Sequence, residues 1–104
     1  MNIVMLSGEL GPIAPENIFT RPDGARVVDG HIKKYYTING TIRESRFYYT
    51  ISGAKAEKLI NEYLQGDKVI LTGKLISRVD QDGRYWFTIN ATGIAKLDPT
   101  EEDA

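Results

Sequence analysis

The sequence contains no cysteine and only one histidine, His31. Without thiols the chain can form no disulfide, and it offers neither a thiolate nucleophile nor cysteine ligands for zinc or an iron-sulfur cluster. It also lacks a glycine-rich phosphate loop with its Lys-Ser/Thr pair, and it has no second histidine to complete a two-histidine metal motif. We therefore expect no metal and no cofactor.

Few residues remain that could carry out catalysis. Asp80 and Asp82 are close in sequence, but the segment DQDG is typical of a turn, which explains both acids more simply than an acid/base pair does. Ser7 and Ser45 have no evident base beside them. We therefore expect no catalytic residues and a binding protein rather than an enzyme.

Long apolar runs and a basic leader are also missing. No segment approaches the roughly 20 apolar residues that span a bilayer, so we expect a cytoplasmic protein.

The 104 residues, 41% of them apolar, suit one domain, which we place at residues 1–97. Residues 98–104 hold four of the fourteen acids and are expected to form a disordered acidic tail. The rest has thirteen Lys/Arg against ten Asp/Glu, a mild excess that permits a polyanionic partner without demanding one.

β-Branched and aromatic residues recur in runs bounded by Gly, Pro, Asn and Asp, which is typical of strands. We predict strands at residues 2–10, 26–38, 41–52, 68–79 and 84–97, with a bulge at Gly30 and a short strand at 18–20. The segment AKAEKLINEYLQG carries an apolar stripe that runs from Ala56 to Leu64 at helical spacing, with Gly66 as its C′ residue. Five strands with one helix between the third and the fourth is the order of the OB-fold, a small Greek-key barrel.

The Asn39-Gly40 pair is a strong signal for a two-residue hairpin turn. Such a turn places Ile38 opposite Thr41 and sets the register of the whole hairpin. One face of the hairpin then becomes apolar toward its base, where it should cover the barrel interior. On this basis we assign five rings mainly to the core: Tyr36, Phe47, Tyr49, Tyr85 and Phe87.

The other face of the hairpin combines rings with cations, and so does the outer face of the last two strands. Burying such cations without partners is costly, whereas unpaired nucleic acid offers bases that stack on rings and phosphates that attract Lys and Arg. The predicted stacking residues are Tyr35, Tyr48 and Trp86. The predicted phosphate contacts are Lys33, Arg46, Lys74 and Arg78, followed by His31, Lys34 and Arg43. Each residue has a simpler explanation, since rings pack well in strands and lysines protect sheet edges; only the combination favours binding.

Several segments carry a resemblance to a known family. MNIVMLSGEL, PE, FTRPDG, YLQGDKVILTGKL and the DG turn before RYWFTI resemble the bacterial single-stranded-DNA-binding proteins (SSB), over about residues 1–97. The resemblance implies an OB-fold that binds single-stranded DNA without sequence preference and oligomerises partly through its first strand. It thereby implies an oligomer interface at Asn2, Ile3, Val4 and Met5, where the strand is apolar on both faces. A homodimer is expected, with a tetramer as the alternative, and RNA stays open as a ligand.

The resemblance also has departures. Val79 and Asp80 stand where the family usually carries a ring, and the chain ends at EEDA instead of a long Gly/Gln/Pro-rich tail. MLSGEL, TISG and the short end are similar to the primosomal PriB branch, which implies replication restart beside the PriA helicase. Three alternatives stay open: a coating SSB whose tail is cut away, an OB module that binds proteins, and an oligosaccharide-binding or toxin-like OB domain.

Overall fold

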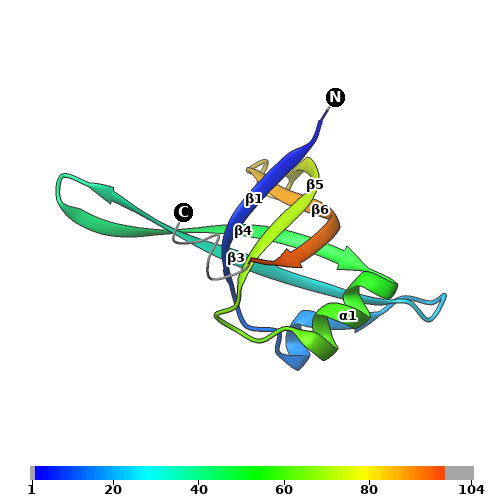
Figure 1. Cartoon of the computed structure of the whole chain (residues 1–104). Helices are drawn as coiled ribbons and strands as arrows, with labels where there is room; N and C mark the ends of the chain where they lie inside the picture. Colours follow the sequence, from blue (N-terminus) through cyan, green and yellow to red (C-terminus); the bar gives the residue numbers. More distant parts are fainter. Residues whose placement is uncertain (1, 98–104) are drawn as a thin grey trace.

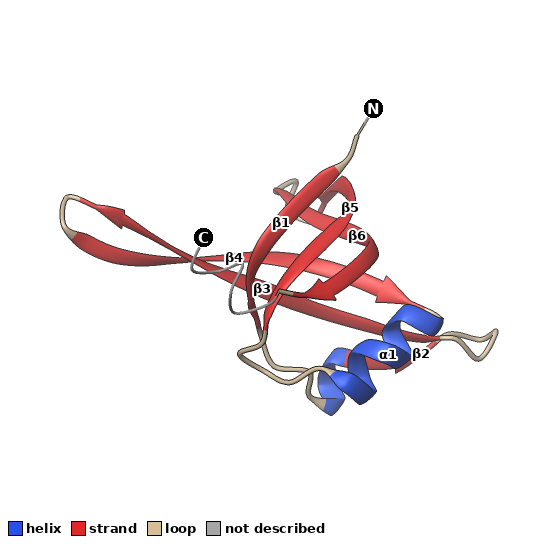
Figure 2. Cartoon of the chain, in the orientation of Figure 1, coloured by secondary structure: helices blue, strands red, loops and turns tan. Residues whose placement is uncertain are grey.

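The structure is a computed structural model that describes residues 2–97, so the predicted tail at 98–104 lies outside the described residues. Six strands, one α-helix and a 3-10 turn follow one another along the chain (Figures 1 and 2). The elements are β1 Val4–Leu10, η1 Pro15–Asn17, β2 Ile18–Thr20, β3 Arg26–Ile38, β4 Thr41–Ser52, α1 Ala54–Glu62, β5 Lys68–Val79 and β6 Tyr85–Lys96. The predicted strands, including the short one at 18–20, are confirmed. No helix in this part of the chain is long and apolar enough to cross a membrane.

The strands form one sheet that closes on itself. Their order is β1-β5-β6-β4-β3-β2, and an additional β1–β3 pairing at Glu9 with Lys33 and Leu10 with Ile32 joins the ends. All pairings are antiparallel except the short parallel contact between β4 and β6. The result is a closed five-stranded barrel, with β2 added beside β3 and with α1 between the third and fourth barrel strands. The predicted OB-fold is confirmed.

The β3–β4 hairpin has the register that its turn predicts. Asn39 (φ 50°) and Gly40 (φ 79°) both have positive φ, as a two-residue primed turn requires. Pairing then runs without interruption from Ile38 with Thr41 to Val27 with Ser52. The hairpin is longer than the barrel is tall, so its tip extends as a free arm on one side of the molecule (Figure 1).

Buried aliphatic side chains and two tyrosines fill the barrel. They are Leu10, Val28, Ile32, Tyr49, Ile51, Ala56, Leu59, Tyr63, Val69, Leu71 and Ile89. Each fully buried side chain of the size of leucine contributes about 1.5–3 kcal/mol relative to its exposed state. The helix α1 contributes Ala56 and Leu59 to this core and lies across the lower end of the barrel (Figure 2).

The end of α1 differs from the prediction. The helix stops at Glu62, because Tyr63 takes an extended conformation that turns its ring into the core and lets its hydroxyl donate to the Ile94 carbonyl at 3.3 Å. Leu64 is therefore exposed rather than part of the apolar stripe. Gly66 is not the C′ residue; it lies in the following turn, with its N–H donating to the Leu10 carbonyl.

Gly30 does not form the predicted bulge. It pairs in register with Tyr49, and a Cβ atom at this position would lie 2.6 Å from the Tyr49 hydroxyl oxygen. The glycine therefore makes room for a ring instead of bending the strand. The irregularity of the sheet lies elsewhere, between Thr72 and Gly73 of β5, where Thr92 is the extra residue on β6.

Four of the five rings assigned to the core are exposed: Tyr36, Phe47, Tyr85 and Phe87. Only Tyr49 is buried. The alternation of side chains places Phe47 and Phe87 on the inner face as expected, but the β3–β4 and β5–β6 hairpins both extend beyond the closed part of the barrel. There the inner face has nothing packed over it, so its rings stay open to solvent.

An ion pair attaches α1 to the start of β3. The Arg26 guanidinium donates to both Glu57 carboxylate oxygens, at 2.7 and 2.6 Å. This contact lowers the pKa of Glu57 below its ordinary value of 4.5. The pair therefore stabilises the fold above pH 4.5, and the contribution disappears as the pH falls through the lowered pKa.

Replacing Glu57 by glutamine is expected to lower the melting temperature at neutral pH, because the charge of the ion pair is lost. In acid, well below pH 4.5, the wild-type carboxylate is protonated, so the wild type and Glu57→Gln should have the same melting temperature. Thermal unfolding followed by circular dichroism across this range measures the difference. Glu62→Gln on the same helix is the matched control, since Glu62 makes no ion pair within residues 2–97. A difference that persists unchanged in acid would contradict the assignment.

Candidate nucleic-acid interface

A cleft of about 490 Å³ runs along the outer face of β3, β4 and β6 and reaches β2. We call it the indole cleft, after Trp86. Its lining residues are Asn17, Phe19, Asp29, Gly30, His31, Tyr48, Tyr49, Thr50, Arg78, Trp86 and Thr88. Its volume lies within the range of ordinary small-ligand sites. The cleft therefore has room for one or a few flat groups.

Two predicted stacking rings, Tyr48 and Trp86, stand on the wall of this cleft. Their side chains are about half exposed, 52% for Tyr48 and 45% for Trp86. Arg78 pairs with Trp86 across the β5–β6 ladder, and its guanidinium lies 5.9 Å from the centre of the indole ring. Ring and cation thus stand side by side, as expected of a surface that contacts a base and its phosphate.

His31 supplies a ring to the cleft rather than a positive charge. It faces Tyr48 edge-on, with 6.0 Å between the ring centroids. Partial burial, together with the charges of Arg46 and Lys33, lowers the pKa of His31 below 6.5. The imidazole is therefore mostly neutral at neutral pH, which makes His31 a poor phosphate contact.

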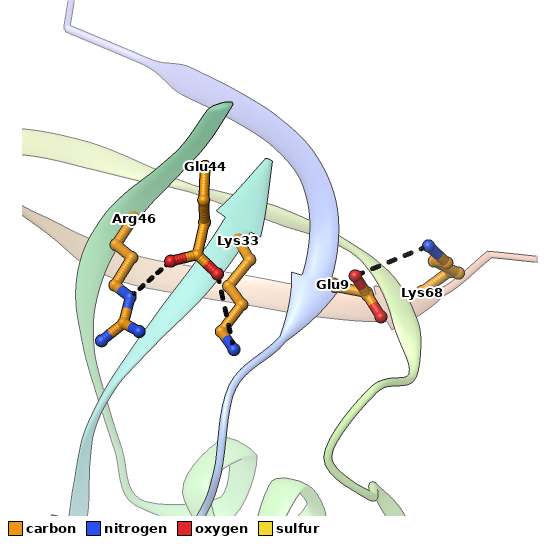
Figure 3. Close-up of polar contacts among 5 residues, drawn as sticks. All are labelled: Glu9, Lys33, Glu44, Arg46 and Lys68. Atoms are coloured by element: carbon orange, nitrogen blue, oxygen red, sulfur yellow. Dashed lines mark hydrogen bonds and ion pairs between the residues drawn. The ribbon is translucent and has the colours of Figure 1, made fainter. Parts of the chain in front are cut away.

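Lys33 and Arg46 share one carboxylate on the hairpin. Glu44 accepts a hydrogen bond from Arg46 Nε at 3.1 Å, and its other oxygen lies 3.6 Å from Lys33 Nζ (Figure 3). The Arg46 hydrogen bond is the main reason that the pKa of Glu44 is lowered. Exposed ion pairs of this kind contribute little to stability. A phosphate can therefore compete with Glu44 for both cations.

The predicted residues Lys33, Lys34 and Tyr35 line a second, separate cleft, together with Glu9 and Lys68. Glu9 lies 3.9 Å from Lys68 Nζ (Figure 3), and its negative charge raises the pKa of Tyr35. Tyr35 is exposed and lines this cleft, whereas Tyr48 and Trp86 line the indole cleft. The structure thus divides the predicted site into two parts.

Two predicted cations stand outside all of these clefts. Lys74 is exposed on β5 opposite Asn90, and Arg43 is exposed near the tip of the hairpin opposite Tyr36. Within residues 2–97, neither side chain makes an ion pair, and Lys34 and Arg78 make none either. These four cations are available to a polyanion without breaking an ion pair between described residues.

An apolar groove lies on the opposite side of the Tyr48–Trp86 pair. We define it by its lining residues: Val4, Leu6, Arg46, Phe47, Tyr48, Leu75, Trp86, Phe87 and Ile89. Two of its rings, Phe47 and Phe87, come from the set that the sequence assigned to the core. Tyr48 and Trp86 therefore form a ridge between the indole cleft and a second, almost entirely apolar surface.

Sequence reasoning missed the polar part of the indole cleft. Asp29 pairs with Thr50 on the same face as His31 and Tyr48, so the predicted register already places it beside the rings. Phe19 carried no such signal, because only the pairing of β2 with β3 brings it to the cleft. Asn17 is held there by donating to the Asp29 carbonyl at 3.0 Å.

The proposed oligomer residues Asn2, Ile3, Val4 and Met5 stand at the free end of β1. Ile3 and Met5 are 61% and 68% exposed, whereas Val4 packs against the core. Asn2 extends the β1–β5 pairing, since its side chain donates to the Leu75 carbonyl at 2.6 Å. In the described part of the chain β1 pairs with β3 only at Glu9 and Leu10, and Gly8 packs against Lys33 without pairing, so one edge of residues 4–7 has no strand paired with it.

Residues 2–97 contain no cluster of three or more His, Cys, Asp or Glu side chains that could hold a metal ion. What the clefts offer instead is flat rings, cations and a few hydrogen-bonding groups, which suit a ligand that is aromatic and anionic.

Neither a comparison with models of known protein families nor a search of curated proteins finds a match to this chain.

Proposed function

We propose that this protein binds single-stranded nucleic acid along the Tyr48–Trp86 ridge, with single-stranded DNA as the main ligand. The observation that carries the proposal is the meeting of two half-exposed rings with Arg78 on one cleft wall. Base stacking on such rings contributes about 1–3 kcal/mol per base. Neither core packing nor solubility explains rings that stay exposed beside a cation.

Phosphate contacts would supply the rest of the affinity. Arg78 stands beside the Trp86 ring, and Lys74, Lys34 and Arg43 are available on the neighbouring strands. Lys33 and Arg46 would join them by exchanging Glu44 for a phosphate. Because this part of the affinity comes from the release of counterions, it does not depend on sequence and it weakens as salt rises.

The quoted resemblance supports a finer form of the proposal. We place the protein in the cytoplasm, in DNA replication and in particular in replication restart, as a PriB-like primosome accessory that acts beside a PriA-type helicase. A general coating protein is the alternative. A homodimer through β1 is supported by the exposed Ile3 and Met5 and by the edge of residues 4–7, which pairs with no strand in the described part of the chain. A mass measurement in solution tests it, with a monomer as the contradicting result.

The fluorescence of Trp86 provides the direct test of the proposal. Because Trp86 is the only tryptophan, its emission reports on the indole cleft without labelling. Titration with oligo-dT is expected to quench this emission through stacking on the ring. The apparent affinity should fall linearly with salt on a double-logarithmic plot. Unaltered emission at low ionic strength would refute the proposal.

Replacing Glu44 by glutamine is expected to strengthen DNA binding and to steepen its salt dependence. The change removes the carboxylate that holds Lys33 and Arg46, so both cations become free to release counterions from the strand. Fluorescence titrations at several salt concentrations measure the slope. Lys33→Ala removes one of these cations and should make the salt dependence of the affinity less steep. If the wild type and both variants had the same salt dependence of affinity, the hairpin cations Lys33 and Arg46 would not be part of the interface.

The apolar groove favours a second candidate function, a module that binds another protein. Phe47, Leu75 and Phe87 are exposed there although they lie on the inner face of the sheet. Exposed apolar surface of this kind often marks a protein contact. This candidate predicts that oligo-dT leaves the emission of Trp86 and the melting temperature unchanged at every salt concentration. The same titration therefore separates the two functions.

A further inference from the structure

One carboxylate stands in a cleft otherwise suited to an anionic strand. Asp29 lines the indole cleft beside Tyr48 and Trp86. A phosphate passing this point would be repelled, and a surface that only neutralises phosphates has no use for an acid. Within residues 2–97 Asp29 makes no ion pair that would cancel its charge.

The side chain of Asp29 is held in a defined position. Its Oδ1 accepts a hydrogen bond from the Thr50 hydroxyl at 2.6 Å, and its main-chain carbonyl accepts one from Asn17 Nδ2 at 3.0 Å. Among the described residues, no other donor contacts the carboxylate. Oδ2 therefore keeps its capacity to accept hydrogen bonds from a ligand, and so does the remaining lone pair of Oδ1.

The neighbouring surface allows a flat group to approach this carboxylate. Asp29 and His31 share one face of β3, opposite Thr50 and Tyr48 on β4, and residues two apart on a strand are separated by roughly 7 Å. Gly30 lies between them, and a Cβ there would point to the other face of the sheet, toward Tyr49. Tyr49, which pairs with Gly30, also lines the cleft, and its buried hydroxyl makes no hydrogen bond within residues 2–97.

We infer that the indole cleft reads the edge of one nucleobase, and that it prefers guanine. This inference rests on the proposed function, because the base must first stack on the Tyr48–Trp86 ridge. A carboxylate only accepts hydrogen bonds. Guanine presents two adjacent donors on its Watson–Crick edge, N1–H and the N2 amino group, which match the two carboxylate oxygens. Unpaired bases are commonly recognised by stacking together with hydrogen bonds to this edge.

The other bases fit Asp29 less well. Cytosine and adenine offer one amino donor beside a ring nitrogen that would face the carboxylate as a second acceptor. Thymine offers one N–H between two carbonyl oxygens, both of which the carboxylate repels. The expected order of affinity is guanine first, cytosine and adenine next, and thymine last. The phosphate contacts stay indifferent to sequence, so the preference applies to one nucleotide of the bound strand.

The test compares short oligo-dT strands that differ at one central base. The central base is thymine, guanine or inosine, which lacks the N2 amino group of guanine. Fluorescence anisotropy of end-labelled strands measures each affinity. We expect the guanine strand to bind about fivefold or more tightly than oligo-dT, the gain from one bidentate contact to a base edge. Inosine should retain only part of this gain.

Asp29→Asn completes the test. The asparagine can still accept from Thr50, but it has lost the charge and presents a donor beside its acceptor. Guanine and thymine strands should then bind about equally. Asp82→Asn removes the same charge from an exposed turn outside the cleft and should keep the preference. Equal affinities of the wild-type protein for all three strands would overturn this inference alone, and so would a guanine preference that survives in Asp29→Asn. Failure to bind any strand would overturn the proposed function with it.

Discussion

Replacing both Tyr48 and Trp86 by leucine is expected to reduce the affinity for oligo-dT roughly 30-fold at the least, because each ring contributes about 1–3 kcal/mol of base stacking. Leucine keeps apolar volume at both exposed positions, so the fold should be little affected. The loss should come almost entirely from the part of the affinity that does not depend on salt, since no cation is changed. Anisotropy of a labelled strand measures the affinity, because the double variant has no tryptophan.

Tyr85→Leu is the matched control for this experiment. Tyr85 adjoins Trp86 on β6 and is more exposed, at 73%, but it points to the other face and lines neither the indole cleft nor the apolar groove. Its replacement should leave the affinity nearly unchanged. If Tyr85→Leu weakened binding as much as the double variant does, exposed rings in general would be responsible and the ridge would have no special role.

Replacing Gly30 by alanine is expected to destabilise the protein by about 1–3 kcal/mol, the usual effect of overpacking a core. The added Cβ would lie 2.6 Å from the Tyr49 hydroxyl oxygen and 2.8 Å from the ring carbon that bears it. Tyr49 is itself buried in the barrel, so its ring has little room to move away. For a domain of this size, each 1 kcal/mol lowers the melting temperature by about 4–8 °C, which thermal unfolding detects readily.

Gly93→Ala on β6 is the matched control for Gly30→Ala. A Cβ at Gly93 would meet no atom of residues 2–97 within 4 Å, and the backbone there does not need positive φ. The added methyl group should leave the stability unchanged or raise it slightly, because alanine restricts the unfolded chain. If the two variants lost the same stability, a general cost of alanine in these strands would explain the result better than the contact with Tyr49.

Several features of the fold follow from local sequence. The Asn39-Gly40 turn determines the pairing of the two longest strands, because only a primed turn joins them so tightly and every later pair follows from the first. The strand bounds and the place of the helix were also predictable, since they depend on periodic patterns within a few residues of one another. The bulge was not. It arises at Gly73, where a Cβ would collide with the backbone at Asn90, a residue far along the chain.

The candidate site is only partly a local property. Alternation along β4 and β6 indicated that Tyr48 and Trp86 point outward, and both do. Whether the rings on the opposite face are covered depends on how far each hairpin extends past the barrel, and for that reason Phe47 and Phe87 were assigned wrongly. The pattern also could not show how the predicted residues group, because Lys34 and Tyr35 line one cleft and the Tyr48–Trp86 ridge borders another.

By itself, then, the sequence determined the strands, their facing directions and the mixture of rings and cations that the outer face carries. Only the tertiary structure decided which of these side chains meet, that Glu44 already holds Lys33 and Arg46, and that Asp29 and Phe19 join the indole cleft. The physical reason is that side-chain direction is set by the backbone within one strand. Which side chains lie close together and which are buried depends on the positions of the other strands, and these positions are determined when the barrel closes.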